Sequence, residues 1–103
     1  MATRLRKAAN GQDCSVRIPN ICQYSGSSVI LAHIRTPGTG VGRKPHDMQA
    51  VLACGKCHDA IGDGSEARLE RLGYTKYVLR ALLVTWATWR DLKLVRVIGD
   101  TDQ

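Results

Sequence analysis

The sequence predicts a small α+β domain with two short strands, a helix after them and additional helices toward the C-terminus. Three observations support this prediction. Segment 28–34 is apolar and partly β-branched, and 49–53 is a second short apolar run, as expected for strands. A Cys-x-x-Cys knuckle at Cys54 and Cys57 follows the second run and leads into a helix. From residue 65 onward, capping residues and apolar stretches are typical of helices.

Size and composition allow one domain that spans residues 1–103. With 103 residues and 44% hydrophobic content the chain can bury a core, although aromatic residues make up only 5% and Phe is absent. Domains this small are often held together by a metal ion or by disulfides. We divide the chain into a basic arm at 1–12, a zinc-stapled strand–strand–helix core at 13–62 and a C-terminal helical extension at 65–98.

The chain is basic, with 15 Lys and Arg against 9 Asp and Glu and a formal net charge of +6. Such a balance favours a polyanionic partner, most simply nucleic acid, with DNA expected before RNA. The alternative is a basic, soluble surface without such a role. No apolar run reaches about 18 residues, and no apolar signal core follows the charged N-terminus. We therefore expect a cytoplasmic protein without a membrane partner.

The first half of the chain alternates regular segments with breaks. Residues 1–12 are expected to form an irregular basic arm. The first strand places His33 on one face with Val29 and Leu31, because side chains alternate along a strand. The segment 36–47 contains three glycines and two prolines, so it predicts a long loop between the strands.

Three breaks separate the helices expected after the second strand. A first helix starts at about His58 and is broken by glycines within 62–64. Ser65 is a suitable N-cap for a helix over 66–72. Gly73 ends that helix, because glycine readily adopts the left-handed conformation found at helix C-termini.

The segment from 75 to about 92 predicts a long helix. It is apolar on most faces within 78–89, which indicates deep burial or a subunit contact and allows a homodimer through 78–89. We interpret Trp86 and Trp89 on this helix as core or dimer packing rather than as surfaces for base stacking. A short extended segment, 95–98, is expected to follow.

Two pairs of cysteines could hold one metal ion: Cys14, Cys22, Cys54 and Cys57. Four thiolates suit the tetrahedral coordination of Zn²⁺, and the Cys-x-x-Cys spacing folds both sulfurs of the second pair onto one ion. The first pair is more widely spaced, but the turn at Pro19 can still bring its thiolates together. A site with four protein ligands stabilises the fold and does no chemistry. The alternatives are two disulfides or buried free thiols, and a reducing compartment favours metal over disulfides.

The Cys-x-x-Cys-His sequence at 54–58 also matches the attachment site of c-type haem. Haem attachment requires export to an oxidising compartment and usually a second axial ligand. An export signal is missing, and haem would leave two cysteines unexplained, so we favour zinc.

Two histidines are expected to meet in one cleft. His33 lies on the strand that would pair with the one leading to the knuckle, and His58 follows the knuckle directly. One imidazole can take a proton from water, and a divalent cation such as Mg²⁺ or Mn²⁺ held by the other can stabilise charge on a phosphorane. The simpler alternative is that both histidines are structural. Basic side chains of the same region could hold a phosphate backbone: Arg35, Arg43, Lys44 and Lys56.

Together, His33, the strand–loop–strand segment and the Cys-x-x-Cys-His end resemble the HNH, or ββα-metal, nuclease motif in its zinc-stapled variety. Over a longer stretch the chain is similar to the YbcO family of small prophage proteins, which are suspected nucleases. The likeness runs from Leu5-Arg-Lys-Ala-Ala and Cys14 through Val16-Arg-Ile-Pro19 and Leu31-Ala-His-Ile-Arg35 to Ala53-Cys-x-x-Cys-His-Asp59. It covers residues 5–60 well and the C-terminal third poorly.

The resemblance implies a metal-dependent endonuclease that hydrolyses phosphodiester bonds of nucleic acid. His33 matches the general base that opens the motif, and His58 matches its final histidine, a ligand of the catalytic divalent ion. The four cysteines match the structural zinc site.

The chain departs from the motif at two positions. Ala32 stands where an acidic residue or a histidine commonly precedes the first His, and the middle Asn is missing. The nearby candidates are His46, Asp47 and Gln49, of which Asp47 could orient His33 or bind metal. These departures favour an alternative function, a non-catalytic zinc-stapled module of prophage origin that binds nucleic acid. A third option is a protein-binding accessory that uses the apolar helix.

Overall fold

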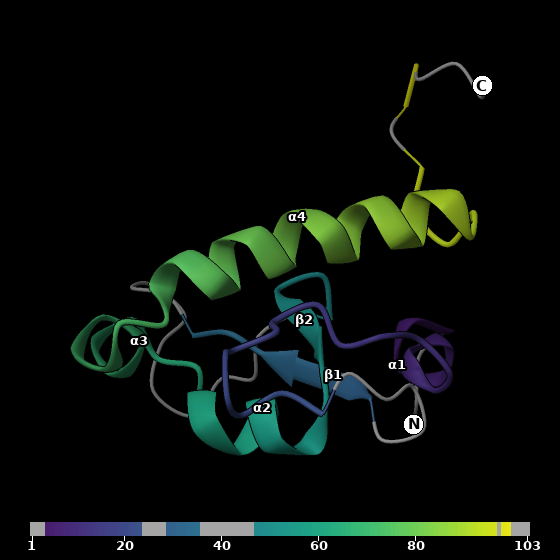
Figure 1. Ribbon diagram of the computed structural model, residues 1–103. Coiled ribbons are helices and arrows are strands. Elements are labelled where there is room, and N and C mark those ends of the chain that lie inside the picture. The colour runs from purple at the N-terminus through teal and green to yellow at the C-terminus, as the bar shows by residue number, and fades with distance from the viewer. Residues whose placement is uncertain (1–3, 24–28, 36–46, 97, 100–103) are drawn as a thin grey trace.

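A computed structural model describes residues 4–23, 29–35, 47–96, 98 and 99. These residues form an α+β fold with a two-stranded sheet (Figure 1). The elements, in chain order, are α1 (Arg4–Ala9), β1 (Ile30–His33), β2 (Ala50–Ala53), α2 (Gly55–Ile61), α3 (Glu66–Leu72) and α4 (Thr75–Asp91).

The two strands form an antiparallel hairpin in which Ile30 pairs with Ala53 and His33 pairs with Ala50. Both strands lie within the predicted segments, whereas the loop predicted over 36–47 falls outside the described residues up to 46. The hairpin lies between α4 on one side and α2 on the other (Figure 1). Because helices cover both faces, all four residues of β2 are buried and the strand does not alternate between polar and apolar residues.

The helix α2 begins at Gly55, three residues before the predicted start at His58. The reason is that Cys54 acts as the N-cap, and its Sγ accepts a hydrogen bond from the backbone N–H of Cys57 at 3.4 Å. Beyond the end of α2, the carbonyl of Gly64 accepts the N–H of Arg35 at 2.9 Å. The far end of α2 is therefore tied to the chain that leaves β1.

The predicted bounds of α3 are confirmed: Ser65 caps it by accepting the N–H of Arg68, and Gly73 ends it with a φ of +74°. The helix α4 ends at Asp91, within a residue of the prediction. Beyond it, the described residues of the segment predicted to be extended, 95–98, form no strand. Instead, the Leu94 N–H bonds back to the Trp89 carbonyl, a helix-terminating turn of the Schellman type.

The N-terminal segment expected to be an irregular arm contains the helix α1, so that prediction is wrong for residues 4–9. The run Leu5-Arg-Lys-Ala-Ala consists of good helix formers. The helix packs against β1 and buries Ala9, which is 1% exposed. Packing against the sheet therefore stabilises a helix that would be too short to persist alone.

A buried polar network joins α4 to the hairpin. The Thr85 hydroxyl accepts the backbone N–H of Leu52 at 3.1 Å and lies 3.1 Å from the Ser15 hydroxyl, which donates to the Leu52 carbonyl at 2.7 Å. Ser15 and Thr85 are both buried, and each buried polar group of this network has a partner. The network fixes the segment that carries Cys14 against β2.

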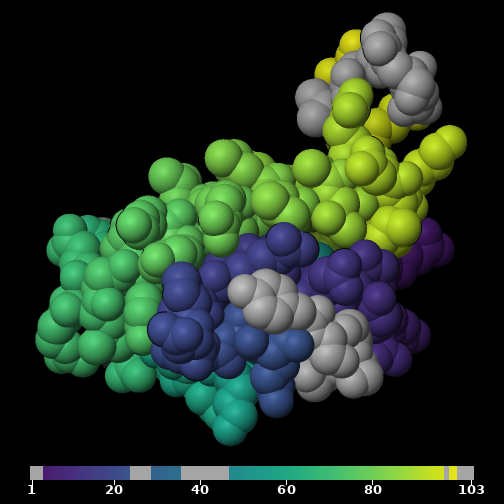
Figure 2. Space-filling model, in the orientation of Figure 1, coloured from purple at the N-terminus to yellow at the C-terminus, as the bar shows by residue number. Residues whose placement is uncertain are grey.

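The surface of α4 that faces away from the hairpin stays uncovered within the described chain. Figure 2 shows α4 running along one side of the molecule, above the N-terminal segment. Trp89 is buried in the core, as predicted, whereas Trp86 is 42% exposed. Among the described residues, no helix has the length and hydropathy needed to cross a lipid bilayer.

Candidate functional site

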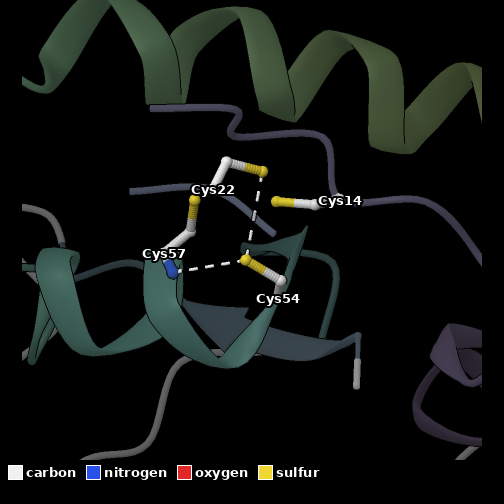
Figure 3. A group of neighbouring side chains, drawn as sticks. All are labelled: Cys14, Cys22, Cys54 and Cys57. Atoms are coloured by element: carbon white, nitrogen blue, oxygen red, sulfur yellow. Dashed lines mark hydrogen bonds between the residues drawn. The ribbon is translucent and has the colours of Figure 1, made fainter. Parts of the chain in front are cut away.

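The four cysteines converge at one point in the structure, as predicted. Their Sγ atoms all lie within 4.8 Å of one another, and Figure 3 shows them pointing toward a common centre. Cys54 and Cys57 come from the junction of β2 and α2, and Cys14 and Cys22 come from the segment between α1 and β1. Cys14, Cys54 and Cys57 are buried and Cys22 is half-buried.

A turn in the backbone brings the wider pair of cysteines together. The N–H groups of Ile21 and Cys22 both donate to the Ile18 carbonyl, at 3.1 and 3.0 Å. Asn20 has a φ of +66°, a conformation that asparagine tolerates better than most residues. On the other side, Ser15 donates its N–H to the Leu52 carbonyl at 2.8 Å, which holds Cys14 beside the end of β2.

The sulfur geometry fits a tetrahedral metal ion. A zinc ion with Zn–S bonds of about 2.3 Å places its sulfurs about 3.8 Å apart. The Sγ atoms of Cys22 and Cys54 are 4.0 Å apart, about twice the length of an S–S bond, and all four cysteines are free of disulfides. The cluster is therefore a candidate site for a structural zinc ion, which four thiolates would coordinate fully.

Backbone donors prepare Cys54 to carry negative charge. Burial alone would raise the pKa of Cys54, but hydrogen bonds from the N–H groups of Gln23 and Cys57 and from neighbouring thiols lower it to about 7. The pKa of the Cys57 thiol is raised, mainly by burial and further by the neighbouring Cys14. A thiolate is the form that binds metal, so Cys54 supplies charge that favours a cation at the centre of the cluster.

The same geometry disfavours haem attachment. Cys54 and Cys57 are both 0% exposed, and their sulfurs face those of Cys14 and Cys22 rather than solvent. A haem vinyl group could not reach them without displacing the chain that covers them.

A carboxylate contacts the candidate general base. His33, at the end of β1, lies with its Nε2 2.8 Å from Oδ1 of Asp47. The same carboxylate oxygen accepts a hydrogen bond from Nε of Arg6 on α1 at 3.3 Å. The Asp47 side chain is 14% exposed and that of His33 25%, so the contact is partly shielded from water. The structure thus brings Asp47 to His33, and it adds an arginine from the N-terminal helix.

The other predicted site residues differ in their exposure and in the elements that carry them. His58 is half-buried on α2, directly after the cluster ligand Cys57, and Lys56 is exposed on the same helix. Arg35 follows β1 and forms an isolated parallel β-bridge with the backbone of Ser65. It also lines a hollow between α3 and α4. Arg43 and Lys44 lie outside the described residues.

The hydrogen bond from Arg6 to Asp47 was not predicted from the sequence. The bond joins residues 41 positions apart, and nothing in the local pattern around Arg6 distinguishes it from the other basic residues of the segment. Its only sequence signal is helical spacing within Leu5-Arg-Lys-Ala-Ala, which would have placed it on one face of a short helix.

The fold and the site define a small α+β protein with a cluster of four cysteines that could hold a metal ion. The chain belongs to the family described as "Putative nuclease YbcO", which matches residues 3–94. It is 42% identical over 84 residues to the protein of that name from Escherichia coli K12, covering 72% of this chain and 88% of the relative. The protein of the same name from Enterobacteria phage 82 matches to the same extent. A solved structure described as a putative bacteriophage protein from Escherichia coli K-12 superposes with a TM-score of 0.65 at 33% identity, covering 87% of this chain and all of that one.

Proposed function

We propose that this protein is a metal-dependent endonuclease of the HNH type that hydrolyses phosphodiester bonds, with His33 as the general base. The observation that carries the proposal is the contact between His33 and Asp47, at 2.8 Å, on a hairpin whose second strand leads into the four-cysteine cluster. The relatives named as nucleases favour the same class of reaction.

The order of elements supports the HNH assignment. β1 carries His33, β2 pairs with it, and α2 follows directly with His58. In this arrangement the four cysteines hold the junction between β2 and α2 rigid, so the zinc ion would act on geometry and not on the substrate. The two histidines then belong to elements whose relative position is fixed by the hairpin and the cluster.

The contact with Asp47 decides which ring nitrogen of His33 is the base. A carboxylate can only accept a hydrogen bond, so Nε2 carries the hydrogen and Nδ1 keeps its lone pair. Nδ1 then takes the proton of the attacking water, and the carboxylate of Asp47 stabilises the imidazolium that forms. Arg6 holds the carboxylate in place, since its Nε donates to the same oxygen.

His58 is the residue that we assign to the catalytic divalent ion. When bound, a divalent cation supplies charge stabilisation for the phosphorane and for the leaving oxygen. Apart from the four cysteines, the described chain contains no group of three or more potential ligands, so water and phosphate oxygens would complete the coordination. Exposed Lys56, together with Arg35, Arg43 and Lys44, would hold the phosphate backbone of the substrate.

Two observations favour the alternative function, a zinc-stapled module that binds nucleic acid without cutting it. The described residues offer no second cage of ligands, and Ala32 stands where the motif commonly has a ligand. Such a module would keep the net charge of +6 and the metal centre, and it would use His33 only structurally.

A cleavage assay separates the two functions. Zinc-loaded protein is incubated with plasmid DNA and with RNA in the presence of Mg²⁺ or Mn²⁺, and His33→Ala is compared with Asp59→Asn, a control at an exposed carboxylate of α2. We expect cleavage by the wild type and the control and its loss in His33→Ala, with unchanged zinc content and melting temperature. Salt-sensitive binding without cleavage under every ion would instead support the binding module.

A further inference from the structure

One face of α4 carries a row of apolar side chains that are about half exposed to solvent in the described chain. Leu79, Leu83 and Trp86 are 60%, 59% and 42% exposed, and Arg90 continues the row. The spacing of four, three and four residues places them on a single stripe of the helix, the pattern of a coiled-coil seam. We call Leu79, Leu83, Trp86 and Arg90 the α4 seam.

Two hollows flank the seam at its two ends. One, of about 230 Å³, lies against the N-terminal half of α4 and is lined by Leu79, Leu82 and Glu66 of α3, among others. The other, of about 370 Å³, lies against the C-terminal half and is lined by Trp86, Ala87 and Arg90, with Met48 and Val95. Leu83 lies between them. The Trp86 indole is fixed by its Nε1, which donates to the Met48 carbonyl at 3.1 Å.

We propose that the α4 seam is a dimer interface and that its occupant is the α4 of a second copy of this chain, running antiparallel. A twofold axis beside Leu83 brings the N-terminal half of the seam onto the C-terminal half of the seam in the second copy. The same surface of both copies then forms the contact, as in an isologous interface.

Antiparallel packing fills each hollow with a side chain of the partner. Leu79 enters the space between Leu83, Trp86, Ala87 and Arg90 of the second copy, a four-residue hole of the kind that receives a knob in a coiled coil. The small side chain of Ala87 leaves room for the leucine. By the same register, Leu83 packs between Leu79, Leu82, Leu83 and Trp86 of the second copy.

The charges beside the seam select the antiparallel direction. Lys76 and Asp91 lie on the same flank at opposite ends of α4, so antiparallel helices place each Lys76 near the partner's Asp91. Arg90 likewise approaches the end of the seam where Glu66 lines the hollow. Parallel helices would instead keep each Lys76 far along the helix axis from the partner's Asp91, because 15 positions separate the two residues on α4.

Sedimentation equilibrium over a concentration series tests the interface, independently of whether the protein is a nuclease. A single helix pair buries less than a standard interface of about 1,600 Å², so we expect a dimer of moderate affinity. The weight-average mass of reduced, zinc-loaded protein should rise from 11.3 kDa toward twice that value. A wild type that stays at the monomer mass throughout would overturn the proposal.

Two matched substitutions locate the contact. Leu83→Asp should keep the protein monomeric, because it places a carboxylate in the centre of the seam. Val84→Asp alters the next residue, which is 45% exposed but points to another side of α4, and it should dimerise like the wild type. Equal loss of dimer in both variants, with native circular dichroism, would contradict the seam as the interface.

A charge reversal tests the direction of the helices and does not depend on the leucine variants. Lys76→Glu and Asp91→Lys should each weaken the dimer, and the double variant should restore it, because the pair is exchanged rather than removed. A double variant weaker than either single variant would reject the antiparallel arrangement.

Discussion

Asp47 lies against His33 with 2.8 Å between Oδ1 and Nε2, although 14 positions separate the two residues in the chain. The contact places a carboxylate oxygen within hydrogen-bond distance of the strand histidine. Under the proposed function, Asp47 would orient this histidine in a chain that lacks the middle asparagine of the HNH motif.

Replacing Asp47 with asparagine tests this contact. The introduced amide can present an N–H to His33 and favour the wrong tautomer, so we expect cleavage to fall by about 10- to 100-fold, the usual cost of losing a partner that orients a functional imidazole. Single-turnover cleavage rates measure the loss. Asp59→Asn, on the exposed surface of α2, should cleave like the wild type. An Asp47→Asn protein with an unchanged rate would show that Asp47 has no part in orienting the base.

Removal of the zinc ion should unfold the core rather than only inactivate it. The cluster joins the segment before β1 to the start of α2, and structural zinc sites contribute directly to folding free energy. We expect one zinc ion per chain by elemental analysis, and a large loss of melting temperature on chelation or in Cys54→Ser. Retention of the native melting temperature after complete zinc removal would contradict a structural role.

The hydroxyl group of Thr85 should contribute to the stability of the fold through its hydrogen bonds, beyond the packing of the side chain. Thr85→Val removes the acceptor of the Leu52 N–H and a partner of the Ser15 hydroxyl, both buried. We expect a loss of about 1–3 kcal/mol in the free energy of unfolding, measured by urea denaturation. The matched control is Thr88→Val on the same helix, whose hydroxyl bonds only back to the Val84 carbonyl, and its effect should stay within about 0.5 kcal/mol. Equal effects of the two substitutions would refute the network.

Gly64 is predicted to control the position of His33. Its φ is +69°, and a Cβ there would collide with the carbonyl oxygen of His33. Gly73 has a similar φ of +74° but open space around it, so Gly73→Ala isolates the backbone strain. We expect Gly64→Ala to destabilise the protein more than Gly73→Ala, which should cost about 1 kcal/mol, and to lower cleavage as well. If the two variants had equal stability and activity, Gly64 would not constrain the strand end.

Local signals in the sequence were sufficient for much of the fold. The strands and the helices α3 and α4 were predicted because their signals are local: apolar runs mark the segments, and Ser65 and Gly73 mark the two ends of α3. The start of α2 was placed too late because a cysteine serves as its N-cap, a role that is usually taken by Ser, Thr, Asp or Asn. The helix α1 was missed although its residues are good helix formers, because so short a helix persists only when it packs on β1.

The parts of the site that depend on residue spacing could be predicted from the sequence. The contacts between residues far apart in the chain could not. The cysteine cluster was predicted from residue type and from the knuckle at Cys54 and Cys57, although the sequence left disulfides and free thiols as alternatives. Asp47 could be named as a candidate partner of His33, but only the structure brings the two side chains together. The contact of Arg6 depends on how α1 packs against the hairpin, and this information is long-range.

The most direct test of the nuclease proposal is chemical rescue of His33→Ala. We predict that this variant binds zinc and folds like the wild type, fails to cleave DNA in Mn²⁺, and regains cleavage when free imidazole is added, because imidazole can replace the missing base. Cleavage by His33→Ala at the wild-type rate without imidazole would contradict His33 as the general base.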